Sequence, residues 1–318
     1  MGIATDMAQQ AAVAEGVLIV KKEAGWTSHD VVAKVRGLLG GVKVGHAGTL
    51  DPAATGVLPV LVGRATRVAE HLVDWDKEYR AVLRLGETTD TQDATGTMLA
   101  QRDASGVSEP AIRGVVARFR GPQQQVPPMY SAVKIGGQPL YKAARAGRTV
   151  ERQARAIVIH ALDILAIDGR DVTLNVVCSK GTYIRTLCVD IGQALGVGGH
   201  LLTLERRRVG PLSIDQALTV EQITAQVAIG TLRDRLITLD QVLDQLPALV
   251  VTDEQAQRVL HGGAVSPLGV EQLSSSPEPV FVRLKNESGR LLAIGTYDAR
   301  MAGVVKVHKV LVENESFN

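Results

Sequence analysis

The sequence of 318 residues has few cysteines, few aromatic side chains and no long apolar run. Its two cysteines, Cys178 and Cys188, fit neither a disulfide framework nor a zinc site, which favours a reducing compartment. No stretch approaches the roughly 18 consecutive apolar residues of a membrane-spanning helix. The first residues, MGIATDMAQQAAVAEG, lack the charged segment and apolar core of a signal peptide. We therefore expect a cytoplasmic protein without a membrane partner, and a flexible tail over residues 1–15.

Common patterns for catalysis and cofactor binding are missing as well. The sequence has no Gly-Lys-Ser/Thr loop for nucleotide phosphates, no serine between paired glycines and no helical two-histidine zinc motif. The seven histidines are scattered along the chain. We therefore expect no cofactor and no metal.

The length and the pattern of apolar residues predict two domains. The first, residues 16–245, is expected to be α/β with a mixed, largely antiparallel sheet, because strands and helices do not alternate strictly. Its strands are predicted at 16–22, 57–63, 77–86, 154–167, 171–179 and 200–209, and its helices at 27–40, 65–74, 108–121 and 182–196.

The second domain, residues 246–314, is expected to be a small β-barrel. A helix over 252–263 has Thr252 and Gln255 as a capping box, and three short strands with turns between them follow. Residues 247–318 carry seven basic and eight acidic side chains, while the whole chain has a net charge of +2. The net positive charge therefore resides in the first domain.

That positive charge is concentrated in two places. The stretch YKAARAGRTVERQARA (141–156) has five basic side chains and one acidic one, and Arg206, Arg207 and Arg208 form a second cluster. Such patches are often simply solvated faces, but two in one domain favour a polyanion such as nucleic acid. The first patch continues an irregular segment, 121–147, of a length that is usually functional or disordered.

One carboxylate, Asp51, lies in the loop GHAGTLDPAATG (45–56), directly before the apolar run VLPVLV. An aspartate in a loop usually closes a turn. A single carboxylate can also serve as nucleophile or proton acceptor where a cation keeps it ionised. Arg185 is the candidate cation, because a basic residue at a helix start is disfavoured by the helix dipole unless it has an anionic partner.

Five motifs resemble the bacterial tRNA pseudouridine-55 synthases, which isomerise a uridine in the T loop of tRNA. They are GHAGTLDPAATGVLPVLVGRATR, DKEYRAVLRLGETTDTQDATG, VPPMYSAVKIGGQPLYKAARAG, CSKGTYIRTLCVDIG and GGHLLTLERRRVG, in the family's order. The resemblance implies that Asp51 is the catalytic carboxylate and that Arg185 pairs with it. It also implies that Tyr79 stacks on the uracil and takes the proton from carbon 5 late in the reaction.

Other roles follow from the same resemblance. His46 would fill the space that the flipped base leaves, and Leu204 would wall the pocket, although an apolar strand residue such as Leu204 or Tyr79 is otherwise core. The resemblance further implies a PUA-like C-terminal domain and an RNA-clamping insertion at about 121–150. The expected RNA contacts outside the catalytic set are Lys22, Tyr141, Lys142, Arg145 and Arg148.

The expected partner is the T stem-loop of tRNA, bound by a monomer without a protein partner. Asp51 could attack the sugar, attack the ring or remove a sugar proton, and the sequence leaves these paths open. The alternative function is a non-catalytic RNA-binding protein or tRNA-folding chaperone on the same fold. The joint presence of Asp51, Tyr79 and Arg185 favours the enzyme.

Overall fold

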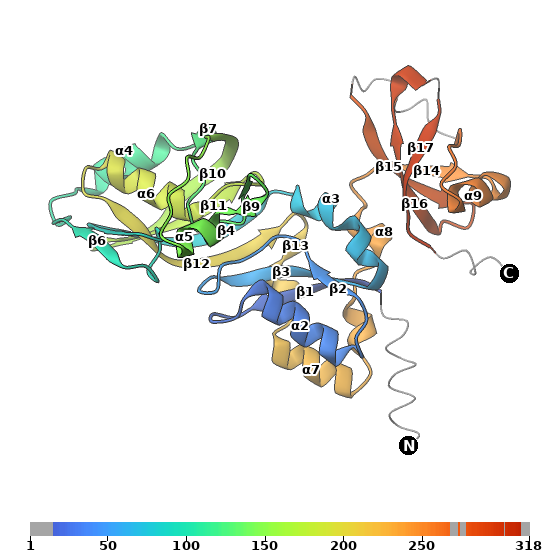
Figure 1. The fold of residues 1–318 in the computed structure, drawn as a ribbon, viewed down its shortest axis with the longest axis horizontal. Helices are drawn as coiled ribbons and strands as arrows, with labels where there is room; N and C mark the ends of the chain where they lie inside the picture. Colours follow the sequence, from blue (N-terminus) through green and yellow to red (C-terminus); the bar gives the residue numbers. More distant parts are fainter. Residues whose placement is uncertain (1–14, 268–272, 274–277, 302, 313–318) are drawn as a thin grey trace.

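A computed structural model describes residues 15–267, 273, 278–301 and 303–312. Apart from Glu15, the predicted tail over residues 1–15 lies outside this described part. Figure 1 shows a large sheet with its helices on one side of the molecule and the smaller C-terminal sheet on the other. The two parts meet near α3 (Ala69–Val73) and α8 (Leu239–Val242).

The large sheet has nine strands and is antiparallel except at one pairing, between β3 and β12. This confirms the predicted mixed, largely antiparallel sheet. The strand order along the main path is β1 (Gly16–Lys22), β3 (Thr55–Val62), β12 (Gly199–Val209), β4 (Lys77–Leu85), β11 (Asp171–Cys178), β10 (Arg155–Asp168) and β7 (Gly121–Gln125). Two short strands, β2 (Val44–His46) and β13 (Leu212–Ser213), pair with β3 and β12.

Strand β7 differs from the prediction, which placed residues 121–125 in an irregular segment. Its sequence, GPQQQ, has no apolar alternation that would indicate a strand. Its backbone pairs with β10 at the end of the sheet. Backbone pairing, rather than burial of side chains, therefore makes this segment a strand.

Helices cover the sheet where the sequence predicts them. In α2 (Ser28–Leu38), Thr27 and Asp30 form a reciprocal capping box, and α4 (Glu109–Ala117) is capped by Ser108. The predicted helix over 65–74 begins as a 3-10 turn, and only its second half is α3. Helices α7 (Val220–Ala228) and α8 were not predicted, although each has a capping box.

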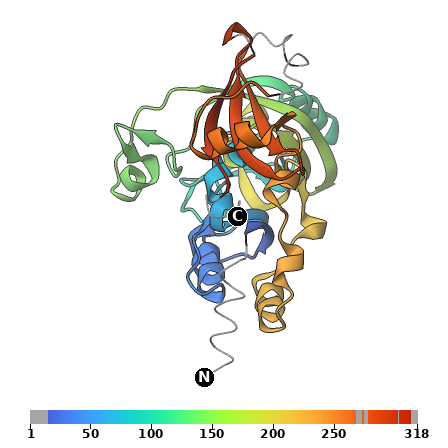
Figure 2. The same ribbon diagram turned by 90° about the vertical axis from the view of Figure 1, so that its right-hand side faces the viewer.

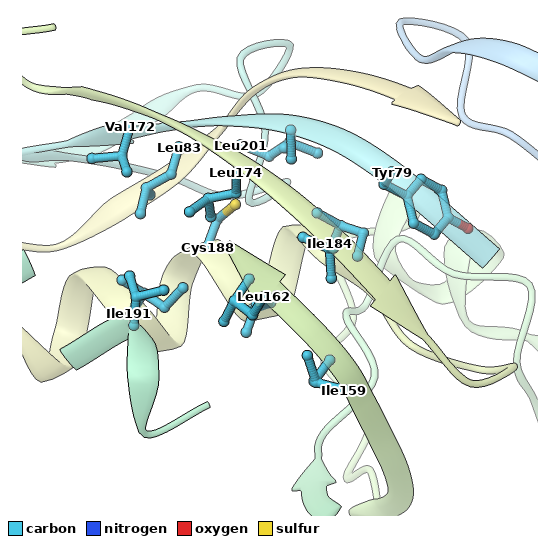
Figure 3. Close-up of a cluster of buried hydrophobic side chains, with 14 of the residues drawn as sticks. Tyr79, Leu83, Ile159, Leu162, Val172, Leu174, Ile184, Cys188, Ile191 and Leu201 are labelled. Carbon is cyan, nitrogen blue, oxygen red and sulfur yellow. The ribbon is translucent and has the colours of Figure 1, made fainter. Parts of the chain in front are cut away.

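Helix α6 (Ile184–Ala194) packs on the sheet and defines the core beside the candidate site. Figure 3 shows Cys188 and Ile191 of this helix against Leu174 and Leu162 of the sheet. Tyr79 lies at one end of the same cluster, with its hydroxyl directed away from the aliphatic side chains. Both cysteines of the chain are buried free thiols.

The C-terminal sheet has four strands, β14 (Ala248–Val251), β15 (Val280–Asn286), β16 (Leu291–Tyr297) and β17 (Val305–Val310), in that order. Helix α9 (Asp253–Leu260) has the predicted capping box of Thr252 and Gln255. Within the described residues no pairing joins β14 to β17, but Val265 forms an antiparallel bridge with Val305 of β17, and a closed barrel is not seen in this part of the chain.

The segment between β7 and β10 forms an arm that extends from the body of the molecule (Figure 2). It contains a small hairpin of β8 (Lys134–Ile135) and β9 (Gln138–Pro139), followed by α5 (Leu140–Arg145). A second hairpin is formed by β5 (Glu87–Thr89) and β6 (Met98–Gln101), which the loop over residues 90–97 joins. In the part of the chain that the structure describes, no helix has the length and apolar character needed to cross a membrane.

Candidate active site

The loop that carries Asp51 is anchored on both sides of the carboxylate. The Ser28 hydroxyl accepts a hydrogen bond from the Leu50 amide at 2.9 Å. The Pro52 carbonyl accepts from the Gly25 amide at 2.9 Å and from the Lys22 ammonium at 3.1 Å. The backbone is therefore fixed on both sides of Asp51, while the Asp51 side chain takes no part in these anchoring contacts.

Arg185, in the first turn of α6, is the cation that pairs with Asp51. Its Nε lies 3.0 Å from Asp51 Oδ2, and the Arg185 side chain is only 6% exposed. Its two other nitrogens donate to the Thr91 carbonyl at 3.2 Å and the Tyr130 carbonyl at 2.8 Å. A second carboxylate, Asp93, lies 4.0 Å from the same Nε. The guanidinium is thus fixed by three segments of the chain, and its disfavoured place at a helix start is explained by its anionic partners.

The pKa of Asp51 is set by opposing contributions. Burial raises the pKa of the Asp51 carboxyl above its ordinary value, and the nearby Asp93 charge raises it further. The charges of Arg185 and Lys22 act in the opposite direction. A carboxylate with a raised pKa is a stronger base than an ordinary one, which suits a group that must accept a proton or attack carbon.

Asp51 and Arg185 line a pocket of about 570 Å³. Tyr79 and Leu204, both predicted site residues, line the same pocket. Tyr79 is 9% exposed, and burial raises the pKa of its phenol. Leu204 also packs against the aliphatic core, so the core interpretation and the pocket-wall interpretation both hold for it. Four residues from four separate motifs therefore converge on one cavity.

This arrangement can be compared with known proteins. The family model described as "TruB family pseudouridylate synthase (N terminal domain)" matches residues 36–184. The model described as "tRNA pseudouridylate synthase B C-terminal domain" matches residues 185–258. A tRNA pseudouridine synthase B from Pseudomonas aeruginosa is 44% identical over 90% of this chain and 94% of the relative. One from Bacillus licheniformis is 40% identical over 94% of this chain and 98% of the relative. The chain belongs to the TruB family.

Solved structures agree with the family assignment. A chain of "a Cbf5-Nop10-Gar1 Complex" aligns with a TM-score of 0.75 and 29% identity, over 97% of this chain and 88% of that one. A chain of an H/ACA RNP "bound to a substrate RNA containing 2'-deoxyuridine" aligns with a TM-score of 0.72 and 27% identity, over 98% of this chain and 88% of that one. The fold of the TruB-family chain is thus that of pseudouridine synthases, as predicted.

Two residues predicted for the site, Lys22 and His46, are not among the residues that line this pocket. Lys22 is fully buried, and its ammonium donates to the carbonyls of Glu23, Trp26 and Pro52. Burial lowers the pKa of Lys22 to about 8. The structure thus gives Lys22 a support role for the Asp51 loop in place of the predicted RNA contact, because three carbonyls occupy its donors.

His46 lies on β2, with its ring edge-on to His29 at a centroid distance of 5.4 Å. Its Nδ1 is buried without a hydrogen-bond partner in the described part of the chain. Burial lowers the pKa of His46, and the charges of His29 and Arg206 contribute to the decrease. The ring is therefore favoured in its neutral form, which suits contact with a base better than contact with a phosphate.

The predicted RNA contacts of the insertion lie on or beside α5 of the arm. The Arg145 guanidinium stacks over the Tyr141 ring, 5.5 Å from its centroid. Lys142, Arg145 and Arg148 are exposed, and none has an ion pair with a described residue. Three unpaired cations on a protruding arm are available to an anionic partner.

The sequence analysis missed further residues that line the pocket, among them Lys77, Tyr183 and Arg206. Burial lowers the pKa of Lys77 to about 8, and its ammonium donates to the Val73 and Trp75 carbonyls. Arg206 corrects the prediction of a second basic patch, because it is 1% exposed. Its neighbours in that patch pair with carboxylates, Arg207 with Glu205 and Arg208 with Glu78. Nothing in a run of three arginines indicated that the first points inward.

Proposed function

We propose that this TruB-family enzyme converts a uridine in the T loop of tRNA, at position 55, to pseudouridine, with Asp51 as the catalytic carboxylate. The observation that carries the proposal is the 3.0 Å ion pair of Asp51 and Arg185 in a pocket that Tyr79 also lines. The relatives' printed name, tRNA pseudouridine synthase B, supports tRNA as the substrate.

The pocket suits a base that has left its stack. Isomerisation requires that carbon 5 of uracil replace the ring nitrogen on the sugar, so the base must be extruded at a cost of a few kcal/mol. Tyr79 would stack on the extruded uracil, and Leu204 would close the opposite apolar side. Three uses of the Asp51 carboxylate fit this geometry: attack on the sugar, attack on the ring, or removal of a sugar proton.

The arm would clamp the T stem-loop. Its base is part of the site, because the Tyr130 carbonyl accepts a hydrogen bond from Arg185 and Ser131 lines the pocket. Closure of the arm on RNA would therefore act directly on the partner of Asp51. We propose residues 16–245 as the catalytic unit, working as a monomer, and residues 246–314 as a smaller PUA-like unit with peripheral RNA contacts.

A non-catalytic RNA-binding protein or tRNA-folding chaperone is the alternative. Such a protein would need the exposed cations of the arm but not a buried arginine aligned on a partly exposed carboxylate. The family membership and the Asp51–Arg185 pair both favour the enzyme.

The direct test incubates the purified chain with unmodified tRNA and, separately, with an isolated T stem-loop, and maps pseudouridine at each position. We expect conversion at position 55 in both RNAs. A transcript with cytidine at that position serves as the control and should stay unmodified throughout. Folded protein that binds tRNA but leaves position 55 as uridine would support the alternative.

The arm should dominate RNA affinity. Replacing Lys142, Arg145 and Arg148 together by glutamine should weaken tRNA binding and flatten its salt dependence, with each lost phosphate contact reducing the slope by roughly one. Titration with tRNA over a series of salt concentrations measures both effects. A matched variant with Arg113, Arg118 and Arg233 changed to glutamine removes the same charge from other exposed sites and should keep the slope. Equal slopes in the two variants would place the RNA surface elsewhere.

The C-terminal sheet should contribute less to binding than to stability. Ile294 and Leu311 pack in the same buried cluster as Val242 and Leu243 of the catalytic part, and Arg283 forms an ion pair with Asp240 of the catalytic part at 2.8 Å. A chain that ends at Gln245 exposes this cluster, so its melting temperature should fall. Its tRNA affinity should drop by only about 1–2 kcal/mol, and modification should persist. Loss of all binding in a folded truncation would assign the main RNA surface to the C-terminal sheet.

A further inference from the structure

Arg206 is a buried cation without a carboxylate partner among the described residues. It is 1% exposed and lines the same pocket as Asp51 and Tyr79. A buried charge is costly unless hydrogen bonds satisfy it, and replacement by an apolar side chain of similar size is often neutral or stabilising. Stability alone therefore does not explain an arginine at this position.

The guanidinium binds the backbone that leads to Asp51. Its Nε donates to the Val57 carbonyl of β3 at 2.7 Å, and its other nitrogens donate to the Gly48 carbonyl at 2.9 Å and the Thr49 carbonyl at 3.4 Å. The backbone approach is close, because a Cβ on Gly56 would overlap the Arg206 carbonyl oxygen. One planar group thus fixes both ends of the Asp51 loop relative to the sheet.

The charge of the same side chain acts on Tyr79, and both residues line the pocket. The two residues face each other across the pairing of β12 with β4. A guanidinium is positively charged and can only donate hydrogen bonds, so it favours the phenolate oxygen over the neutral phenol. Burial raises the pKa of Tyr79, and the Arg206 charge opposes that rise. Arg206 is therefore the main group next to Tyr79 that favours the ionised phenol.

We propose that Arg206 is a positioning residue that stabilises the phenolate of Tyr79 while it holds the loop of Asp51. The inference rests on the proposed function of Asp51 and Tyr79. In the late step the phenolate oxygen takes the proton from carbon 5, and the electrons of the broken C–H bond re-form the C5–C6 double bond. The pair that this displaces from carbon 6 moves to ring N1, or leaves with the Asp51 carboxylate if that is bonded to carbon 6. Ring N1 takes a proton from water and the phenol returns its proton to water, so the isomerisation balances without a further reactant.

The test compares Arg206→Met and Arg206→Lys in single-turnover reactions on tRNA with hydrogen or deuterium at carbon 5 of the target uridine. Arg206→Met should slow the reaction by roughly 10²-fold or more, the usual effect of disabling a proton-transfer group. The rate difference between the two isotopes should exceed that of the unmodified enzyme, because C–H cleavage becomes rate-limiting. Arg206→Lys should lie between, since it keeps the charge but not the planar fork.

A rescue experiment distinguishes stabilisation of the Tyr79 phenolate by Arg206 from a role of Arg206 in holding the Asp51 loop alone. The phenol of 3-fluorotyrosine is more acidic than that of tyrosine, so more of it is ionised at neutral pH. Placed at position 79, it should restore part of the rate that Arg206→Met loses. A merely structural role of Arg206 would leave the rate unchanged by this substitution.

Arg84→Met is the matched control, because Arg84 is a half-buried arginine of the same strand as Tyr79 that pairs with Asp171 at 2.7 Å. It should lower the melting temperature but keep the rate and the isotope effect. An unmodified enzyme that fails to convert tRNA would overturn the proposed function and this inference with it. An active enzyme in which Arg206→Met is as fast, or shows an unaltered isotope effect and no rescue, would overturn the inference alone. If Arg206→Met does not fold, the isotope effect of Arg206→Lys decides in the same way.

Discussion

Asp51→Asn should bind tRNA normally and form no detectable pseudouridine. The amide keeps the shape of the side chain but can neither attack carbon nor accept a proton, and no other carboxylate lines the pocket within the described residues. Asp93 lies near Arg185, but its side chain is only 17% exposed and is not part of the pocket lining. Single-turnover assays with saturating enzyme and a separate binding titration measure the two effects. Activity within about tenfold of the unmodified enzyme would refute the mechanism, because a lone catalytic carboxylate should be worth more.

The pH dependence of stability gives this variant an internal check. Because the folded-state pKa of Asp51 is raised, its ionised form is disfavoured in the folded protein. Asp51 therefore favours folding at low pH and loses that contribution as pH rises through its folded pKa. The free energy of unfolding of Asp51→Asn, relative to that of the unmodified chain, should therefore increase as pH rises from the unfolded-state pKa of Asp51 to its folded-state pKa. Asp163→Asn, an exposed carboxylate paired with Arg120, controls for the change from acid to amide and should keep full activity.

Much of the site could be predicted because it is encoded in local motifs. The resemblance of five local motifs implied that Asp51 pairs with Arg185, and the place of Arg185 at a helix start also suggested an anionic partner. The strands of the catalytic sheet were predicted correctly where apolar alternation marked them, as in β4 with its buried Tyr79. These features depend on neighbours in sequence, which a pattern can detect.

The rest depends on contacts between distant segments. Strand β7 forms through backbone pairing with β10, and no pattern in the side chains of β7 indicates this pairing. The sequence placed Lys22 and Arg206 among surface cations, but each is buried and donates to several main-chain carbonyls, including carbonyls of distant segments. Carbonyl groups occur at every residue, so no sequence pattern indicates where several converge on one cation.

Substitution of Arg185 should be the second most damaging change. Arg185→Gln removes the charge that counters burial of Asp51, so the pKa of the carboxyl should rise further above its ordinary value. The ionised fraction at neutral pH then falls, and the reaction should slow on the order of 10²–10³-fold, as when one preorganised donor is lost. Because the defect lies partly in ionisation, the rate should recover in part as pH rises, and the acid limb of the pH–rate profile should move to higher pH.

Arg185→Lys distinguishes charge from geometry. The guanidinium contacts Asp51, the Thr91 carbonyl and the Tyr130 carbonyl at once, whereas an ammonium on a flexible stem cannot span all three. The lysine variant should therefore restore the position of the acid limb more fully than it restores the maximal rate. It should also weaken the effect of the arm on the reaction rate, because the Tyr130 carbonyl that Arg185 binds lies at the arm's base. Arg84→Lys, which breaks the two-point contact with Asp171 outside the pocket, is the control and should leave both the limb and the rate unchanged. An Arg185→Lys enzyme with the full rate at neutral pH would show that a point charge suffices, and that the fixed fork of Arg185 has no part in the reaction.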